Sequence, residues 1–316
     1  MRRSLLFFPA VFALVAIDSA APAAENFACG VDGKPNAKTA KCDCPASKVE
    51  KTTGDVSRCV DKPAPAAKPS TSSAAPPASS AKALASTTPK ACPLGMAPIA
   101  GGSYTMGVSA QKTTVVDFCM DQTEVTVAAW AACAKTSACV AAPTTVEWVG
   151  INDEQRTKGS AYCNGARVDR LDHPINCVDW NQATAYCAAV GKRLPSEDEW
   201  EWAARAGNKG FTYPWGDDEP QTASVARICW SSGNKRTGTC AVGSFPTGDG
   251  WHGVHDLSGN VWEWTSSKVS PTKTDRAYRG GAWFETVSDR VSAAFRGGDA
   301  ITNRSGGIGF RCVKNP

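Results

Sequence analysis

The fourteen cysteines of this chain restrict its fold more than any other feature. All of them lie after residue 25, behind an N-terminus that reads MRRSLLFFPAVFALVAIDSAAPAAEN. Two arginines precede an apolar run from Ser4 to Ile17, and small residues follow, which is typical of a secretory signal peptide cleaved near Ala23 or Ala24. An even number of cysteines in an exported chain predicts disulfides. We therefore expect a disulfide-stapled protein that is secreted or held in the periplasm or cell envelope.

Composition divides the chain into four parts. They are a signal peptide at 1–24, a small cysteine-rich module at 25–61, a Pro/Ala/Ser linker at 62–90 and a main domain at 91–316. The module contains Cys29, Cys42, Cys44 and Cys59, whose three possible pairings remain open. A zinc knuckle competes with disulfides there, but no histidine lies nearby. The linker has almost no large apolar side chain, which predicts disorder.

Charge and hydropathy exclude some partners. The formal net charge is +4 and no basic block stands out, so nothing indicates nucleic-acid binding. The N-terminal apolar run is too short for a membrane span, and no later segment is apolar enough. We expect a monomer.

Three segments of the main domain have helical signals. They are TEVTVAAWAACAKT at 123–136, NQATAYCAAVGKR at 181–193 and SEDEWEWAARAG at 196–207. In the last one Ser196 and Glu199 have the spacing of a capping box. The remaining sequence is dense in Gly, Pro, Asn, Asp and Trp. This pattern predicts an α+β domain with short strands, long loops and little regular secondary structure.

Seven short segments give the main domain a family resemblance. They are GGSYTMG, FCMDQTEVTVAAW, HPINCVDWNQATAYCAAVGKRLPSEDEWEWAARAG, YPWGD, HDLSGNVWEWT, YRGGAW and GFRCV. In this order the series resembles the formylglycine-generating enzyme family, also called sulfatase-modifying factor domains. The resemblance spans 91–316 and implies a variant of the C-type-lectin-like fold.

The resemblance also implies one disulfide and the loss of another. The implied pair is Cys187–Cys312, from the AYC helix to the final GFRC segment. A second family disulfide is missing at both ends, which fall on Ala204 and about Ala293. For the other eight cysteines of the domain we infer sequence-local pairs, namely Cys92–Cys119, Cys133–Cys139, Cys163–Cys177 and Cys229–Cys240.

The resemblance further implies where catalytic relatives carry their reactive thiols. In them, two cysteines after the GGS motif bind copper(I), which soft thiolates hold well. Here the matching text is GGAWFETVSDRVSAAFR, with Ala282 in place of the serine. The first cysteine position falls on Glu285 and the second near Asp289 or Arg290. No cysteine lies between Cys240 and Cys312, so we do not expect copper.

Iron would need a cluster such as two histidines and a carboxylate. His252 and His255 are the candidates, paired with Asp256 or Glu285, but they are more simply interpreted as loop residues. We do not expect iron. His173 occupies a scaffold position of the family and is interpreted as a hydrogen-bonding residue.

Calcium is the metal that the resemblance favours. The family's LxGNxWEW turn implies ligands at Asp256, the carbonyls of Gly259 and Val261, and Glu263. Calcium prefers such hard oxygens. The alternative is a tight turn held by its own side chains. A second family calcium site has no acidic residue here, and Cys229–Cys240 is expected to replace it.

Six residues are candidates for lining a ligand cleft, namely Trp262, Ala282, Trp283, Glu285, Arg290 and Arg296. Trp148, Trp230 and Trp251 in variable loops are further candidates. Arg279, Arg296 and Arg311 are interpreted as buttresses that pair with Glu263 or Asp256, which leaves Arg290 for a ligand.

The leading hypothesis is a binding or accessory module, a pseudoenzyme that recognises a peptide, glycan or protein partner. The alternative is an oxidoreductase of the same family, acting on an exported substrate with a different metal or cofactor.

Overall fold

We describe the chain from a computed structural model. It describes 92–316, except 108, 223–224 and 233–235, together with four strand backbones nearer the N-terminus. The chain divides into two units, Met1–Ala83 and Leu84–Pro316. The predicted signal peptide, the predicted linker and the pairing of the first four cysteines lie outside the described residues.

The N-terminal unit contains two antiparallel pairs. Strand β1 (Lys34–Asn36) pairs with β2 (Lys41–Asp43), and β3 (Lys48–Thr53) pairs with β4 (Val56–Asp61).

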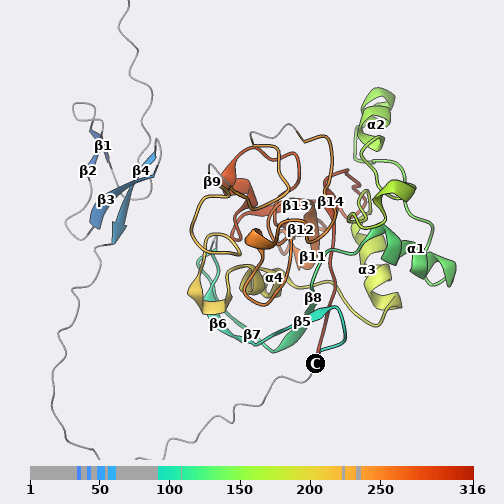
Figure 1. Ribbon diagram of the computed structural model, residues 1–316, viewed down its shortest axis with the longest axis horizontal. Coiled ribbons are helices and arrows are strands. Elements are labelled where there is room, and N and C mark those ends of the chain that lie inside the picture. The colour runs from blue at the N-terminus through green and yellow to red at the C-terminus, as the bar shows by residue number, and fades with distance from the viewer. Residues whose placement is uncertain are drawn as a thin grey trace, which may run out of the picture. The chain divides into compact units, whose positions relative to one another are not determined.

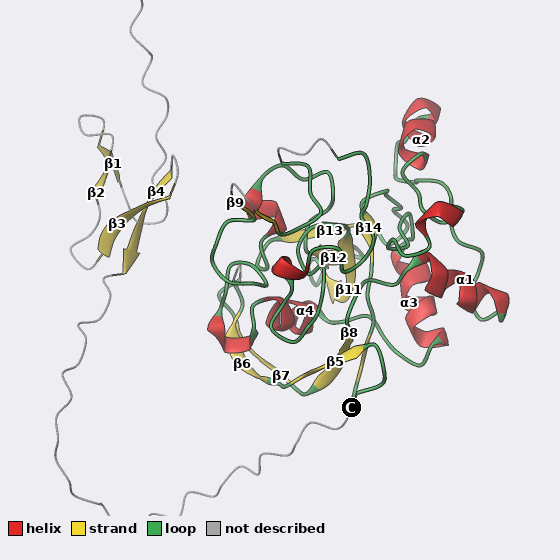
Figure 2. Ribbon diagram, in the orientation of Figure 1, coloured by secondary structure: helices red, strands yellow, loops and turns green. Residues whose placement is uncertain are grey.

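The second unit is built around two small sheets (Figure 1). The larger has the order β13-β12-β11-β14, formed by Arg296–Asp299, Arg276–Arg279, Trp262–Lys268 and Ile308–Gly309. The smaller has the order β15-β8-β5, formed by Val313–Lys314, Phe118–Asp121 and Met96–Ile99. The hairpins β6 (Gly102–Thr105) with β7 (Lys112–Val115), and β9 (Gln221–Thr222) with β10 (Val225–Ala226), complete the strands that the structure describes. Loops make up most of this unit, as Figure 2 shows.

Three of the helices form in the segments that have helical signals in the sequence. Helix α1 (Val127–Lys135) starts after Thr126, α3 (Trp180–Ala189) after Asp179, and α4 (Glu197–Ala204) after Ser196. Each of these preceding side chains accepts a hydrogen bond from a backbone N–H of the first turn. Ser196 and Glu199 form the predicted capping box. The described loops also contain four 3-10 turns, at Val168–Arg170, Gly207–Lys209, Pro246–Gly248 and Ser288–Val291.

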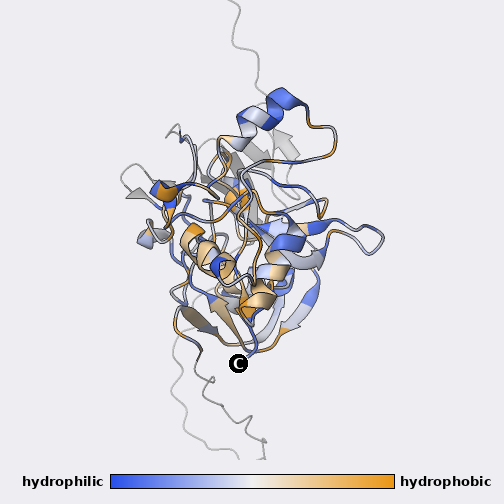
Figure 3. Ribbon diagram, turned by 90° about the vertical axis from the view of Figure 1, so that its right-hand side faces the viewer, coloured by the Kyte–Doolittle hydropathy of each residue, from blue (hydrophilic) through white to orange (hydrophobic). Residues whose placement is uncertain are grey.

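Helix α2 (Asp153–Ser160) was not predicted. It has no buried residue, and Figure 3 shows it as the hydrophilic helix at the top of the view. Because it lacks an apolar face, hydrophobic periodicity gives no signal there. Its capping box, formed by Asn152 and Gln155, was the available clue.

Two of the four buried clusters among the described residues form most of the core. One lies between α1, α3 and β11, where the ring of Trp130 stacks on that of Tyr186 with 5.2 Å between centroids. The other packs α4 against β5 to β8 and contains both Ala204 and Ala293. The two positions of the absent family disulfide are therefore filled by apolar packing.

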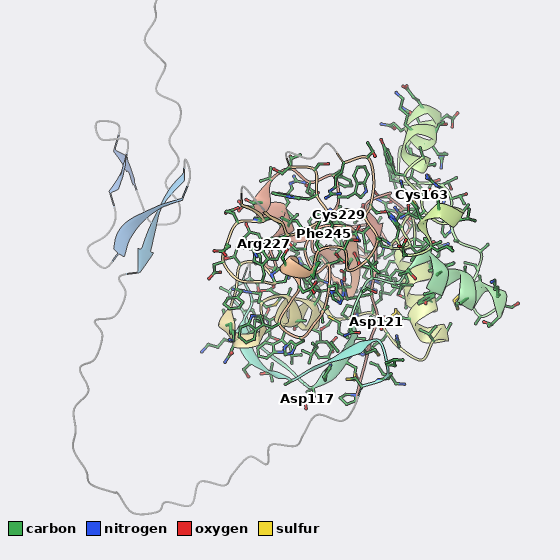
Figure 4. The ribbon with its side chains drawn as sticks, viewed as in Figure 1. Asp117, Asp121, Cys163, Arg227, Cys229 and Phe245 are labelled. Carbon is green, nitrogen blue, oxygen red and sulfur yellow. A yellow bond between two sulfur atoms is a disulfide. The ribbon has the colours of Figure 1, made fainter. Side chains whose placement is uncertain are left out.

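Five disulfides fasten the loops to this core. They are the pairs predicted from the sequence, Cys92–Cys119, Cys133–Cys139, Cys163–Cys177, Cys187–Cys312 and Cys229–Cys240. Figure 4 labels Cys163 and Cys229. No cysteine in the described part of the chain is a free thiol. Such a density of disulfides is typical of proteins from oxidising compartments.

Candidate functional site

A pocket of about 740 Å³ lies beside the larger sheet and is called the β11 pocket here. Its aromatic lining residues are Trp148, Trp262, Tyr278, Phe284 and Phe295. Its charged lining residues are Glu147, Asp275, Glu285, Asp299, Arg290, Arg296 and Arg304. Glu285, which matches the family's first copper cysteine, therefore lines this pocket, and so does Arg290, one of the two residues near the second position; Asp289, the other, is not among the lining residues.

The glycine pair after β12 forms the turn that leads to Glu285 in the β11 pocket. Gly280 and Gly281 have φ values of 98° and 83°, which favour glycine. A Cβ on Gly281 would lie 2.6 Å from a methyl carbon of Val291, so a side chain there would clash. The turn continues to Glu285, whose N–H donates to the carbonyl of Ala282 over 3.0 Å.

Glu285 is a buried carboxylate of the β11 pocket that has fewer hydrogen-bond partners than its burial would lead us to expect. It is only 6% exposed, and its Oε1 accepts a hydrogen bond of 3.2 Å from the indole N–H of Trp262. Its Oε2 lies 3.7 Å from a guanidinium nitrogen of Arg290, which is beyond hydrogen-bond length. Burial raises the pKa of Glu285, while Arg290 and the Trp262 hydrogen bond oppose that shift.

Arg290 stands at the mouth of the β11 pocket. It belongs to the 3-10 turn Ser288–Val291, and its side chain is 55% exposed. Its guanidinium lies 5.9 Å from the ring centroid of Phe295. Because it is exposed and makes no hydrogen bond with Glu285, this arginine is free to exchange one partner for another.

The aromatic side chains of the β11 pocket form a connected wall. The Trp262 ring lies 5.1 Å from that of Tyr278 and 5.7 Å from that of Phe295, centroid to centroid. Phe284 is 43% exposed at the rim, and Val149 beside it is 89% exposed. The wall thus offers ring faces inside and apolar surface at the edge.

Two of the predicted cleft residues lie elsewhere. Ala282 is fully buried in the core, and Trp283 is buried with its indole N–H donating to the carbonyl of Gly306 over 3.1 Å. Of the loop tryptophans, Trp148 lines the β11 pocket, Trp230 is buried and Trp251 is exposed. The side chain of Ala282 is too short to reach the pocket, and the ring of Trp283 is buried against other residues.

The buttressing arginines have different partners from those expected. Arg279 is fully buried and pairs with Glu197 and Glu201 at 2.7 Å and 2.9 Å. Arg296 also pairs with Glu197, at 2.5 Å. The expectation of Glu263 or Asp256 as their partner was therefore wrong, because α4 brings its acidic first turns to them. Arg311 pairs with Glu263 as expected.

The predicted calcium turn lies in a buried cluster of charges, called the Arg311 cluster here. Both oxygens of Glu263 accept hydrogen bonds of 2.7 Å from Arg311, and one also accepts from the indole of Trp200 over 2.8 Å. Asp256 accepts an N–H from Gly243 over 2.6 Å. Burial raises the pKa of Asp256.

Glu124 completes the Arg311 cluster, and the sequence analysis missed it. It is 1% exposed, and neither of its carboxylate oxygens has a hydrogen-bond partner in the described part of the chain. Burial raises the pKa of Glu124 well above its ordinary value, with Asp256 adding to the effect and Arg311 opposing it. When all are ionised, the three carboxylates of Glu124, Asp256 and Glu263 exceed the one guanidinium of Arg311 by two charges.

Two of the histidines, His252 and His255, share one loop, and His173 lies in another. His255 has its Nδ1 2.8 Å from Asp249, and His173 shares a 2.9 Å hydrogen bond with the hydroxyl of Thr239. Burial lowers the pKa of His252 and, more than any other cause, that of His173. Within the ranges that the structure describes, no three His, Cys, Asp or Glu side chains lie close enough together to hold a metal ion by themselves, so an ion in the Arg311 cluster would also need the backbone carbonyls. In the same ranges no helix is long and apolar enough to cross a membrane.

Comparison with solved structures places the fold. PvdO from Pseudomonas aeruginosa is 25% identical with a TM-score of 0.53, and the match covers 70% of this chain and 94% of that one. CarF gives the same identity and TM-score, over 71% of this chain and 99% of that one. The main domain therefore has the fold of these proteins, as the resemblance implied.

Curated proteins match over a shorter region. "Inactive C-alpha-formylglycine-generating enzyme 2" of Bos taurus is 40% identical over 155 residues, 46% of this chain and 51% of the relative. "Formylglycine-generating enzyme" of Streptomyces coelicolor is 34% identical over 177 residues, 48% of this chain and 56% of the relative. "Hercynine oxygenase" of Mycobacterium tuberculosis is 34% identical over 139 residues, 43% of this chain and 29% of the relative. The chain spans about half the length of the first of these relatives.

The family profile covers more of the chain than any of these alignments. The profile described as "Sulfatase-modifying factor enzyme 1-like domain" matches residues 81–316. Because this match includes most of the chain, the protein belongs to the FGE-sulfatase family, the family of sulfatase-modifying factor enzyme 1-like domains.

Proposed function

We propose that this protein is an exported, disulfide-stapled member of its family that binds a peptide, glycan or protein partner without using copper. One observation carries the proposal. Glu285, buried in the β11 pocket, stands where the family resemblance places a copper-binding cysteine, and every described cysteine is in a disulfide.

The chemistry of the side chains supports a role without copper. Copper(I) prefers soft thiolate ligands, whereas a carboxylate is a hard ligand and a guanidinium does not coordinate metals. With Glu285 at the first position and either Asp289 or Arg290 at the second, neither ligand of a thiolate pair is present. A relative named as inactive is at least as similar to this chain as the formylglycine-generating enzymes that also match.

The shape of the β11 pocket supports a binding role. Its volume of about 740 Å³ lies within the usual range for ligand sites, and its aromatic wall with a few charged groups is their usual lining. The exposed rim at Val149 and Phe284 extends that surface beyond the pocket. A partner that inserts one group and lays its neighbours over the rim would use both features.

We also propose that the Arg311 cluster binds one calcium ion. The excess of two buried negative charges is what a divalent cation would neutralise. The carboxylate of Asp256 and the carbonyls of Gly259 and Val261 are the expected ligands, with Glu263. Since Arg311 already occupies both oxygens of Glu263, Glu124 is the better second carboxylate. The ion would hold the turn that leads into β11.

The competing function is oxidation with another metal or cofactor. The similarity to a hercynine oxygenase and to formylglycine-generating enzymes supports this alternative. Oxygen consumption separates the two. The full chain, supplied in turn with copper and with iron, a thiol reductant and a cysteine-containing sulfatase-type peptide, should consume no oxygen above a heat-denatured control. Sustained consumption that depends on the peptide and on either metal would establish the oxidase.

A further inference from the structure

We infer that the β11 pocket receives the side-chain ammonium group of a lysine from a protein segment, with Glu285 as the counter-ion and the aromatic wall around its methylene stem. The inference rests on the proposed binding function and names the chemistry of its partner. Neither the family match nor the similar proteins assign a ligand to this carboxylate.

The first argument is the incomplete pairing of Glu285. Its carboxylate is buried, yet among the described residues only Oε1 has a hydrogen-bond donor, the indole of Trp262. A buried carboxylate is strongly stabilised by a positive donor at hydrogen-bond distance. Arg290 at 3.7 Å does not supply it. A ligand cation at Oε2 would complete the pairing.

The second argument is the aromatic wall beside that oxygen. Trp262, which donates to Glu285, is in ring contact with Tyr278 and Phe295. Ring faces attract cations, tryptophan most strongly, and they also cover methylene groups. A lysine side chain presents both a methylene stem and a terminal cation. The wall and the carboxylate therefore match its two parts in the right order.

The third argument concerns the arginines of the β11 pocket, which would otherwise favour an anion. Arg296 donates to Glu197 and to the carbonyls of Lys268 and Val269, so its nitrogens are occupied. Arg304 faces Glu147 at 4.0 Å. Four carboxylates and three guanidinium groups line the pocket, which leaves it formally negative.

An ammonium group fits the carboxylate better than a guanidinium does. A guanidinium gains most from a carboxylate with both oxygens free, because it binds in a bidentate fork. Trp262 holds one oxygen of Glu285, so only a single-point contact remains. The compact ammonium makes that contact with full charge.

Arg290 acts as the resident competitor in this arrangement. It is the nearest cation to Glu285, more than half exposed, and it lies over Phe295, which is part of the wall. A lysine that enters the pocket would displace it toward solvent. The apolar rim at Val149 and Phe284 indicates that the lysine belongs to a protein segment and not to a small free amine.

The test is a binding titration with five short capped peptides that share one alanine-rich sequence and differ at the centre. The central residue is lysine, norleucine, acetyl-lysine, arginine or glutamate. Calorimetry gives the affinity, and the ¹⁵N signal of the Trp262 indole, assigned with Trp262→Phe, reports contact in the β11 pocket. We expect the lysine peptide to bind about tenfold more tightly than the norleucine peptide and to shift the Trp262 signal.

The variants carry predictions of opposite sign. Glu285→Gln should reduce the lysine preference to about the level of norleucine, while Arg290→Ala should tighten lysine binding about threefold or more because the competitor is gone. Glu154→Gln, which removes a carboxylate on exposed α2, should bind as the wild type does. Thermal unfolding of each variant checks that the fold is retained.

Several results would overturn the inference. They are equal binding of lysine and norleucine, no binding of the lysine peptide, tighter binding of arginine than lysine, and a glutamate preference that Arg290→Ala abolishes. The oxygen-consumption assay is independent of all of them. A protein that consumes no oxygen and has no lysine preference refutes this inference alone, whereas a lysine-binding protein that consumes oxygen refutes the proposed function alone.

Discussion

Two carboxylate–arginine pairs lie on opposite faces of β11 and differ in almost every physical respect. Glu263 and Arg311 are fully buried and joined by two hydrogen bonds of 2.7 Å. Glu285 and Arg290 lie 3.7 Å apart, and the side chain of Arg290 is 55% exposed. Trp262 contacts the second pair, and its neighbour Glu263 belongs to the first, because successive side chains of a strand point to opposite faces.

The difference separates scaffold from binding surface. The Glu263–Arg311 pair is geometrically complete, so a ligand has nothing to add to it except charge compensation for Glu124 and Asp256. The Glu285–Arg290 pair leaves a carboxylate oxygen without a hydrogen bond inside a pocket. Residue type alone does not distinguish the two, since each consists of one glutamate and one arginine.

The largest expected effect is the loss of Arg311. Arg311→Met would leave buried carboxylates without their cation, and breaking a buried pair costs about 3–5 kcal/mol of folding free energy. Urea denaturation measures this loss. The double variant Glu263→Leu/Arg311→Met should recover part of it, because one of the unpaired charges is removed. A loss of less than about 1 kcal/mol for Arg311→Met would contradict the assignment of this pair to the scaffold.

Calcium removal should have the next largest effect. An ion that binds only the folded state adds about 2.7 kcal/mol when its concentration is a hundred times its dissociation constant. Chelation should therefore lower the midpoint of thermal unfolding, and added calcium should restore it. Glu124→Gln should abolish the calcium response while Glu154→Gln keeps it. An identical midpoint for the wild type with calcium and with chelator would refute the calcium site.

A pH series should set Glu285 apart. Burial raises its folded-state pKa, so the folded protein keeps this proton to higher pH than the unfolded chain does. The stability that this group contributes is present below the unfolded-state pKa and is lost as pH rises through the folded-state pKa. Glu285→Gln should remove that loss, so its stability relative to the wild type increases with pH.

This comparison requires that the groups facing Glu285 keep the same protonation state over the pH range. Burial raises the pKa of Tyr278, so its hydroxyl does not titrate in the acidic range. Chemical denaturation from about pH 4 to pH 8 gives the free energies of both proteins. A stability difference that stays flat or falls with rising pH would show that Glu285 is not held in a desolvating environment.

The smallest effect should come from Arg290. Because the pair is exposed on the arginine side and lacks a hydrogen bond, Arg290→Ala should change the folding free energy by less than about 1 kcal/mol. The same urea denaturation used for Arg311→Met measures it. A loss comparable to that of Arg311→Met would erase the difference between the two pairs.

The fold was largely predictable because its signals either are local, as for the helices, or come from short motifs whose order is typical of one family. The helical signals at 123–136, 181–193 and 196–207 fall on α1, α3 and α4, and the order of the seven motifs indicated the family before the profile match at 81–316 showed it. Helix α2 escaped because no residue of it is buried, so its position left no periodic pattern.

The site was only partly predictable, because partners depend on long-range packing. The family motif pointed to Glu285 and Arg290, and the structure places both in the β11 pocket. The same motif gave no partners for Arg279, which pairs across 82 and 78 positions with α4. Glu124 lies in a segment that was used for a helix prediction and for the family assignment, and its lack of a hydrogen-bond partner among the described residues becomes visible only once Asp256 and Arg311 are brought beside it.

The central claim, that the pocket of this family is used here without copper, is tested most directly by a copper-retention measurement. The purified, fully oxidised full chain is incubated with copper(I), passed over a desalting column with a competing chelator and analysed for metal. The account predicts no stoichiometric copper, because the family resemblance places the two thiolates at Glu285 and near Asp289 or Arg290, where this sequence has no cysteine. Retention of one copper ion per chain would contradict it.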